Sequence, residues 1–146
     1  MKNKEELFYK FKPNQTFPQY ISIENEEAEQ KFDTLFLSFG FYHPNGDLFQ
    51  KIDVERAGHF LGEIDETNFS LSKHLHDAKL KAPEKVYIFY LNFNEVYEMK
   101  LKDLDDFFDD LYFPSANDMM VTDRNFTWLF YINDDCMLYK YSSSSA

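Results

Sequence analysis

Three short apolar runs follow one another near the end of the chain, and they restrict its fold more than any other feature. The runs are DMMVT, FTWLFYI and CMLYKY within residues 118–141, and they are separated by DRN and NDD. Aromatic and β-branched runs of this length, with Asp and Asn between them, are typical of antiparallel strands joined by turns. The sequence therefore predicts a C-terminal β-meander.

Two further strand segments precede the meander. KVYIFYLNF, residues 85–93, is rich in β-branched and aromatic residues, and EVYEMKL, residues 95–101, follows it across a turn near Asn92 to Asn94. This arrangement favours a β-hairpin. After Pro18, the residues Tyr20, Ile21 and Ile23 indicate another short strand.

Helical signals dominate the first half of the chain. Residues 25–39 have an acidic first turn, a following Gly40, and apolar residues at helical spacing, namely Ala28, Phe32, Leu35, Phe36 and Phe39. These features predict a helix. Shorter helices are expected over residues 4–12, before Pro13, and within 68–83, where Ser70 or Ser72 can cap. Residues 52–64 fit either a helix or a strand-flanked turn.

Helices that come early and strands that come late indicate an α+β fold, with helices packed on one face of an antiparallel sheet. The 146 residues include 17 Phe and 10 Tyr. A chain of this length can bury a single core without disulfides or metals. We therefore expect one domain, residues 1–146, with a frayed tail at 142–146.

The net charge of the protein limits the classes of molecule that it is expected to bind. The chain has 26 acidic and 15 basic residues, a formal charge of −11, and residues 86–146 alone contain 11 acidic and 4 basic residues. Binding to a nucleic-acid backbone depends on basic side chains, so direct nucleic-acid binding is disfavoured. A basic protein partner suits such a field.

Localisation is predicted from what the sequence contains. Cys136 is the one cysteine, which fits a reducing compartment. Glu5 and Glu6 interrupt the N-terminal region where a signal peptide needs its apolar run, and no apolar segment approaches the length of a membrane span. We expect a cytoplasmic protein that does not enter membranes.

The segment LKDLDDFFDDL, residues 101–111, has the highest density of acidic residues. On a helix, one side carries an apolar stripe of Leu101, Leu104, Phe107, Phe108 and Leu111, and the other carries Asp103, Asp105, Asp106, Asp109 and Asp110. A solvated helix face is one interpretation. A binding face is the other, because Asp is a poor helix former and disfavoured near a helix C-terminus.

No residue pattern identifies a reaction, so no catalytic residue, metal or cofactor is predicted. DDFFD, residues 105–109, matches the metal-binding DDxxD pattern of isoprenoid synthases only in its letters. His74 and His76 would share a face only on a strand. Cys136 lies beside Asp134 and Asp135, which would raise a thiol pKa rather than activate it.

DLYFPSANDMMVTDRNFTWLFYIND, residues 110–134, resembles a stretch of small bacterial immunity proteins from toxin–immunity pairs, including contact-dependent growth inhibition systems. The shared pattern is an acidic helix, a Phe-Pro turn, an Asp-containing strand and a Trp-containing strand. Many of those proteins have a histidine and an acidic residue after the Trp strand, where this chain has Asn133, Asp134 and Asp135.

The resemblance implies a non-enzymatic, intracellular inhibitor that binds a cognate toxin, in many cases a basic nuclease domain. Clustered carboxylates would speed association and pair with the substrate-binding Lys and Arg of such a toxin. The predicted partner-binding residues are Asp103, Asp105, Asp106, Asp109, Asp110, Tyr112, Asp118, Asp123, Asp134 and Asp135. Two alternatives remain, an acidic nucleic-acid mimic that regulates a DNA- or RNA-binding protein, and a small metal-dependent hydrolase using His59, Glu63 or the Asp cluster.

Overall fold

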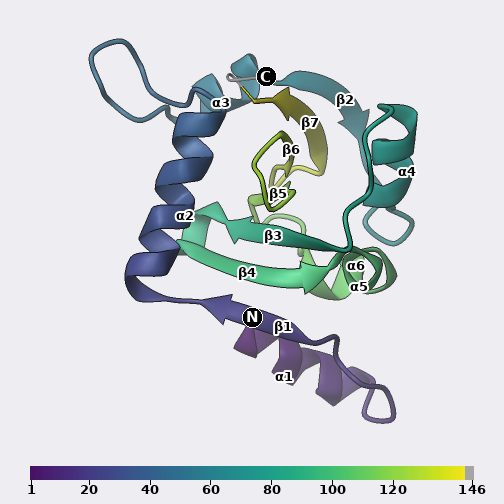
Figure 1. Ribbon diagram of the computed structural model, residues 1–146. Helices are drawn as coiled ribbons and strands as arrows, with labels where there is room; N and C mark the ends of the chain where they lie inside the picture. The colour runs from purple at the N-terminus through teal and green to yellow at the C-terminus, as the bar shows by residue number, and fades with distance from the viewer. Residues whose placement is uncertain (144–146) are drawn as a thin grey trace.

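The strands form one antiparallel sheet in the computed structural model, which describes residues 1–143 (Figure 1). Across the seven-stranded sheet their order is β1, β4, β3, β5, β6, β7, β2. The strand bounds are β1 Tyr20–Ile23, β2 His59–Glu63, β3 Lys85–Tyr90, β4 Glu95–Lys100, β5 Met119–Thr122, β6 Trp128–Ile132 and β7 Met137–Ser142.

The predicted meander and hairpin are confirmed. β5, β6 and β7 are neighbours in the sheet, with Met119 opposite Ile132 and Ile132 opposite Leu138. β3 pairs with β4 through a short 3₁₀ turn, η1 (Leu91–Phe93), and Asn94, whose φ of 52° is left-handed. The fold is therefore α+β, as the order of helical and strand signals predicts.

The helices lie on both faces of the sheet, so the expectation that they cover one face is incomplete. On β3, Val86 and Ile88 pack with α1, α4, α5 and α6, whereas Tyr87 and Phe89 pack toward α2 and α3. The helix bounds are α1 Lys2–Phe11, α2 Asn25–Ser38, α3 Lys51–Ala57, α4 Leu71–Asp77, α5 Leu101–Asp106 and α6 Phe108–Leu111. Central strands that are apolar at successive positions need cover on both sides.

Residues 52–64 contain both of the alternatives that the sequence leaves open. They supply most of α3 and, immediately after Gly58, the edge strand β2. A Cβ atom at Gly58 would lie 2.6 Å from Cζ of Tyr141, so this close crossing requires glycine. The predicted helix at 25–39 is confirmed as α2, and Gly40 follows it with a φ of 71°.

The segment 101–111 is two short helices rather than one. The backbone breaks at Phe107, with φ −120° and ψ 22°. Two adjacent phenylalanines explain the break, because Phe107 packs on Phe8 of α1 at 5.9 Å between ring centroids, while Phe108 packs on Phe69 at 4.4 Å. Successive residues of a regular helix point about 100° apart, and the break aims both rings at apolar neighbours.

The expectation of a frayed tail at 142–146 is wrong for Ser142 and Ser143. Ser142 pairs with Trp128 in the sheet, and the Ser143 N–H donates to the Thr127 carbonyl at 3.2 Å. The backbone there extends the last strand and has partners. Residues 144–146 lie outside the described residues.

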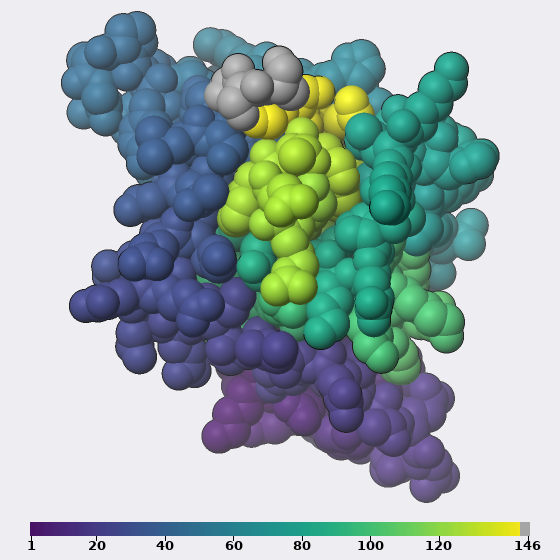
Figure 2. Space-filling model, viewed as in Figure 1, coloured from purple at the N-terminus to yellow at the C-terminus, as the bar shows by residue number. Residues whose placement is uncertain are grey.

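The space-filling view places the C-terminal strands (yellow-green to yellow) between α2 and α4, and the N-terminal residues (purple) at the lower end of the molecule (Figure 2). Within residues 1–143, no helix combines the length and the apolar character needed to cross a bilayer.

Candidate functional site

The Asp105 side chain has a structural role at the start of α4. Its carboxylate accepts the backbone N–H groups of Leu71 at 2.7 Å and Ser72 at 3.3 Å, and also the Ser72 hydroxyl. These donors are at the first turn of α4, where the backbone has no helical acceptor and a negative charge is favourable. Ser70 adds the predicted cap by accepting the Lys73 N–H at 3.2 Å.

Two more aspartates of this segment have internal cations. Asp110 pairs with Lys12 at 3.1 Å, which joins α6 to the end of α1, and Asp106 pairs with Lys102 at 3.6 Å one turn away. Within residues 1–143, only Asp103 and Asp109 of the five have no side-chain partner. The apolar stripe is confirmed, but the expectation of five free carboxylates facing solvent is wrong.

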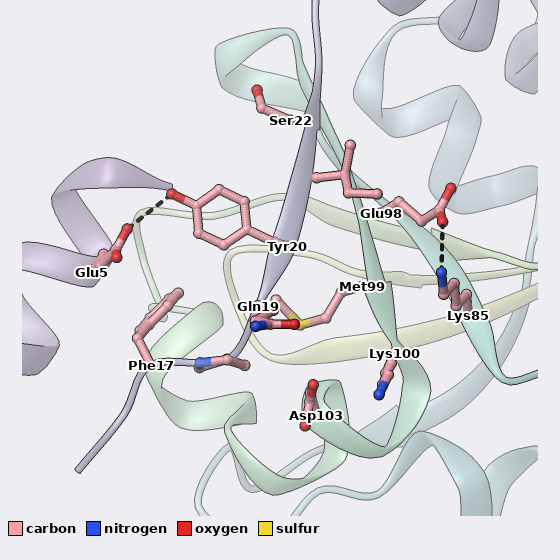
Figure 3. A pocket seen from close by; sticks show the side chains of 12 residues that line it. Glu5, Phe17, Gln19, Tyr20, Ser22, Lys85, Glu98, Met99, Lys100 and Asp103 are labelled. Atoms are coloured by element: carbon pink, nitrogen blue, oxygen red, sulfur yellow. Dashed lines mark hydrogen bonds and ion pairs between the residues drawn. The ribbon is translucent and has the colours of Figure 1, made fainter.

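Asp103 lines a groove of about 630 Å³ beside the edge strand β1 (Figure 3). The Tyr20 hydroxyl donates to Glu5 at 2.9 Å across one side of this groove, and Lys85 pairs with Glu98 at 3.8 Å on the other. Lys100 also lines it. The groove mixes both signs of charge and offers no concentrated acidic surface.

Tyr112 is buried, so the prediction that it is an exposed contact residue is wrong. Its hydroxyl donates to the Asn133 carbonyl and accepts the Cys136 N–H at 3.2 Å. Burial raises the pKa of Tyr112, with a further contribution from Cys136. Through these hydrogen bonds Tyr112, which directly follows α6, contacts the β6–β7 turn. Trp128 is also buried.

Three loops are joined at one end of the sheet: 64–67 after β2, 113–118 before β5, and 133–136 between β6 and β7. The Ile64 N–H donates to the Cys136 carbonyl at 2.8 Å, and the Ser115 N–H donates to the Asp134 carbonyl at 2.7 Å. The Asp134 N–H donates to the Asp118 carboxylate at 3.2 Å. These bonds hold segments distant in sequence in one surface.

Five carboxylates gather on these loops, and we call them the acidic loop surface: Asp65, Glu66, Asp118, Asp134 and Asp135. Lys51, at the start of α3, forms all the ion pairs made to them among residues 1–143, at 2.5 Å to Asp134 and 3.2 Å to Asp118. Partial burial opposes the charge of Lys51, but hydrogen bonds to Asp134 and Asp118 raise its pKa overall. The five carboxylates together with Lys51 have a formal charge of −4.

Hydrogen bonds orient the carboxylate of Asp118 and the backbone of Asp135. Asp118 also accepts the Tyr131 hydroxyl at 2.9 Å, and burial together with the Asp118 charge raises the pKa of that phenol. The Asn133 side chain accepts the N–H groups of Asp135 at 3.0 Å and Met137 at 2.9 Å, which shapes the β6–β7 turn.

Asp123 lies apart from the acidic loop surface. It follows β5, whereas Asp118 precedes it, so the two lie at opposite ends of the strand. The Asp123 carboxylate accepts the Thr127 N–H at 2.7 Å and stabilises the β5–β6 turn.

Of the ten predicted residues, the structure brings Asp118, Asp134 and Asp135 together. Sequence reasoning missed Asp65 and Glu66 of the same surface. No local pattern marks them, because β2 reaches this end of the sheet only by pairing with β7.

The histidines and the cysteine are dispersed. His76 is exposed on α4, while His74 on the same helix stacks on Phe69 at 5.3 Å and burial lowers its pKa. His59 and Glu63 stand at the two ends of β2. In the described part of the chain, no three His, Cys, Asp or Glu side chains lie close enough to hold a metal ion.

Comparison with known proteins assigns no family to this fold and site. No family model, no curated protein and no solved structure matches the chain. Function must therefore be argued from the acidic loop surface itself.

Proposed function

We propose that the protein is a non-enzymatic inhibitor that binds a basic protein through the acidic loop surface. The proposed partner is a cognate bacterial toxin with a basic nuclease domain, and the proposed place of action is the cytoplasm. The resemblance of residues 110–134 to immunity proteins supports this class, and the net charge of −11 favours a basic partner over a nucleic acid.

The observation that carries the proposal is the joining of three loops into one carboxylate-rich surface. Backbone hydrogen bonds hold loops 64–67, 113–118 and 133–136 together before any partner arrives. Binding then loses little conformational entropy in these loops. Lys51 neutralises one of the five charges, which leaves Asp65, Glu66 and Asp135 without an intramolecular cation among the described residues.

The direct test compares two variants of equal charge. In the site variant, Asp65→Asn, Glu66→Gln and Asp135→Asn remove three charges from the acidic loop surface. In the control variant, Glu26→Gln, Glu27→Gln and Glu29→Gln remove three exposed charges from α2. Binding to the product of the neighbouring gene is measured by surface plasmon resonance at several salt concentrations.

We expect the site variant to bind at least about tenfold more weakly and to associate more slowly, with a shallower salt dependence. The control should stay within about threefold of the unchanged protein, because its charges lie outside the contact. Equal losses in both variants would show a general effect of net charge and defeat the proposal. Competition by DNA for a captured host protein would instead favour the nucleic-acid mimic.

A further inference from the structure

A cavity of about 260 Å³ lies between α2, α3 and the sheet, and it is lined by Asp118 of the acidic loop surface and by Lys51, which pairs with Asp118. It lies on the face of the sheet covered by α2, whose position is seen in Figure 1. The cavity therefore joins an apolar interior to a charged end, the combination that small-molecule sites commonly have.

Five of the thirteen residues that line the cavity are aromatic, namely Phe32, Phe36, Phe41, Phe49 and Tyr131. Phe32 and Phe36 enter from α2 with their ring centroids 5.9 Å apart, and Phe41 and Phe49 enter from the following loop at 6.2 Å. Phe32, Phe36 and Phe49 are only half-buried. Partly open ring faces can pack against another ring and also attract a cation.

The polar end of the cavity includes Tyr131, Asp118 and Lys51. Tyr131, only 1% exposed, donates its hydroxyl to Asp118, whose carboxylate also accepts the Asp134 N–H. Lys51 completes this end by pairing with Asp118 and also with Asp134, which neighbours the cavity without lining it. Two carboxylates against one ammonium leave a net negative charge, so a ligand should present a cation here rather than an anion.

We propose that this cavity binds a small arylalkylammonium ion, with its ring between the phenylalanines and its ammonium at Asp118 and Asp134. An apolar cavity of about 150 Å³ can take benzene, so 260 Å³ has room for one ring and a short chain. The ligand ammonium takes the place of Lys51. That side chain is 45% exposed and can turn toward water. This inference does not require the proposed toxin binding, although both proposals use Asp118 and Asp134.

Three probes on the full, unmodified chain separate the contributions of ring and charge. They are 2-phenylethylammonium, the neutral 2-phenylethanol, and ethylammonium, which has no ring. Affinity is measured by calorimetry, and the contact is located from chemical shifts of the Met120 methyl group, which lines the cavity.

We expect 2-phenylethylammonium to bind at least about tenfold more tightly than 2-phenylethanol and also more tightly than ethylammonium. Its binding should change the chemical shift of the Met120 methyl group. Equal binding of amine and alcohol would overturn the charged-ligand assignment. Absence of saturable binding at millimolar amine, or shifts confined to other parts of the chain, would overturn the site.

Lys51→Ala provides a second test, because it removes the resident ammonium. Amine affinity should rise several-fold in this variant while alcohol affinity changes little. The matched control is Lys73→Ala, at an exposed position on α4 across the sheet, which should leave both affinities unchanged. An amine affinity that is unchanged or lower in Lys51→Ala contradicts the exchange of one ammonium for the other.

Discussion

The acidic helices α5–α6 and the acidic loop surface are similar in composition but differ in what their carboxylates do. On α5–α6, Asp105 accepts three donors from the first turn of α4, and Asp110 pairs with Lys12. On the loop surface, Asp65, Glu66 and Asp135 have no intramolecular cation within residues 1–143. A dense acidic run in a sequence therefore does not by itself indicate a free acidic surface.

The difference follows from the surroundings of each region. α5–α6 lies beside the first turn of α4, whose N–H groups Asp105 accepts. Lys12 and Lys102 pair with its aspartates, and Lys100 lines a groove with Asp105 and Asp106. A carboxylate near such donors is stabilised by using them. The loops at the end of the sheet have only Lys51 nearby as an ion-pair partner in the described chain.

The largest expected effect comes from Asp105→Ala. The change leaves the Leu71 and Ser72 N–H groups without their acceptor and removes the favourable charge at the α4 start. We expect the free energy of unfolding, measured by urea denaturation, to fall by about 2 kcal/mol.

Asp109→Ala is its matched control, because Asp109 is exposed and has no side-chain partner among residues 1–143. Its effect should stay within about 0.5 kcal/mol. Similar losses in both variants would mean that Asp105 has no special structural role, and the contrast between the two regions would disappear.

Lys51→Ala should have a smaller effect on stability. It leaves Asp118 and Asp134 adjacent without a cation, and we expect a loss of about 1 kcal/mol at neutral pH that shrinks in 1 M salt. Since the pKa of Lys51 is raised in the folded state, its stabilisation is complete below its ordinary pKa of 10.5 and is lost as pH rises through the folded value. A loss that is unchanged by salt would contradict the ion-pair explanation.

His74→Gln sharpens the helical side of the comparison through pH. Burial lowers the pKa of His74, so the unfolded chain takes up a proton first as pH falls below 6.5. The unchanged protein should therefore lose stability relative to His74→Gln as pH falls below about 6.5. Urea midpoints across this range measure the difference, and the exposed His76→Gln on the same helix is the control. Parallel pH profiles for the unchanged protein and His74→Gln would refute the effect.

Asp106→Asn should have the smallest effect. Its pair with Lys102 joins side chains that are 53% and 85% exposed, so water screens it strongly. We expect a change in unfolding free energy within about 0.3 kcal/mol. A loss above about 1 kcal/mol would show that α5–α6 depends on all its charges, and not mainly on Asp105 and Asp110.

The sequence by itself determined the elements whose signal is local. Helical spacing defined α2, alternating aromatic and β-branched runs with turn residues defined the β3–β4 hairpin and the meander, and the apolar stripe of residues 101–111 was correctly identified. Each of these depends on neighbours within about one turn of helix or one hairpin, which periodicity describes.

Only the tertiary structure decided how the charges are used. The break at Phe107 depends on Phe8, the use of Asp105 depends on α4, and the acidic loop surface depends on β2 reaching β7 across the sheet. These contacts join residues from about 30 to almost 100 positions apart. A carboxylate has the same local pattern whether it caps a distant helix, pairs with a lysine or remains free, and only the fold supplies or withholds its partner.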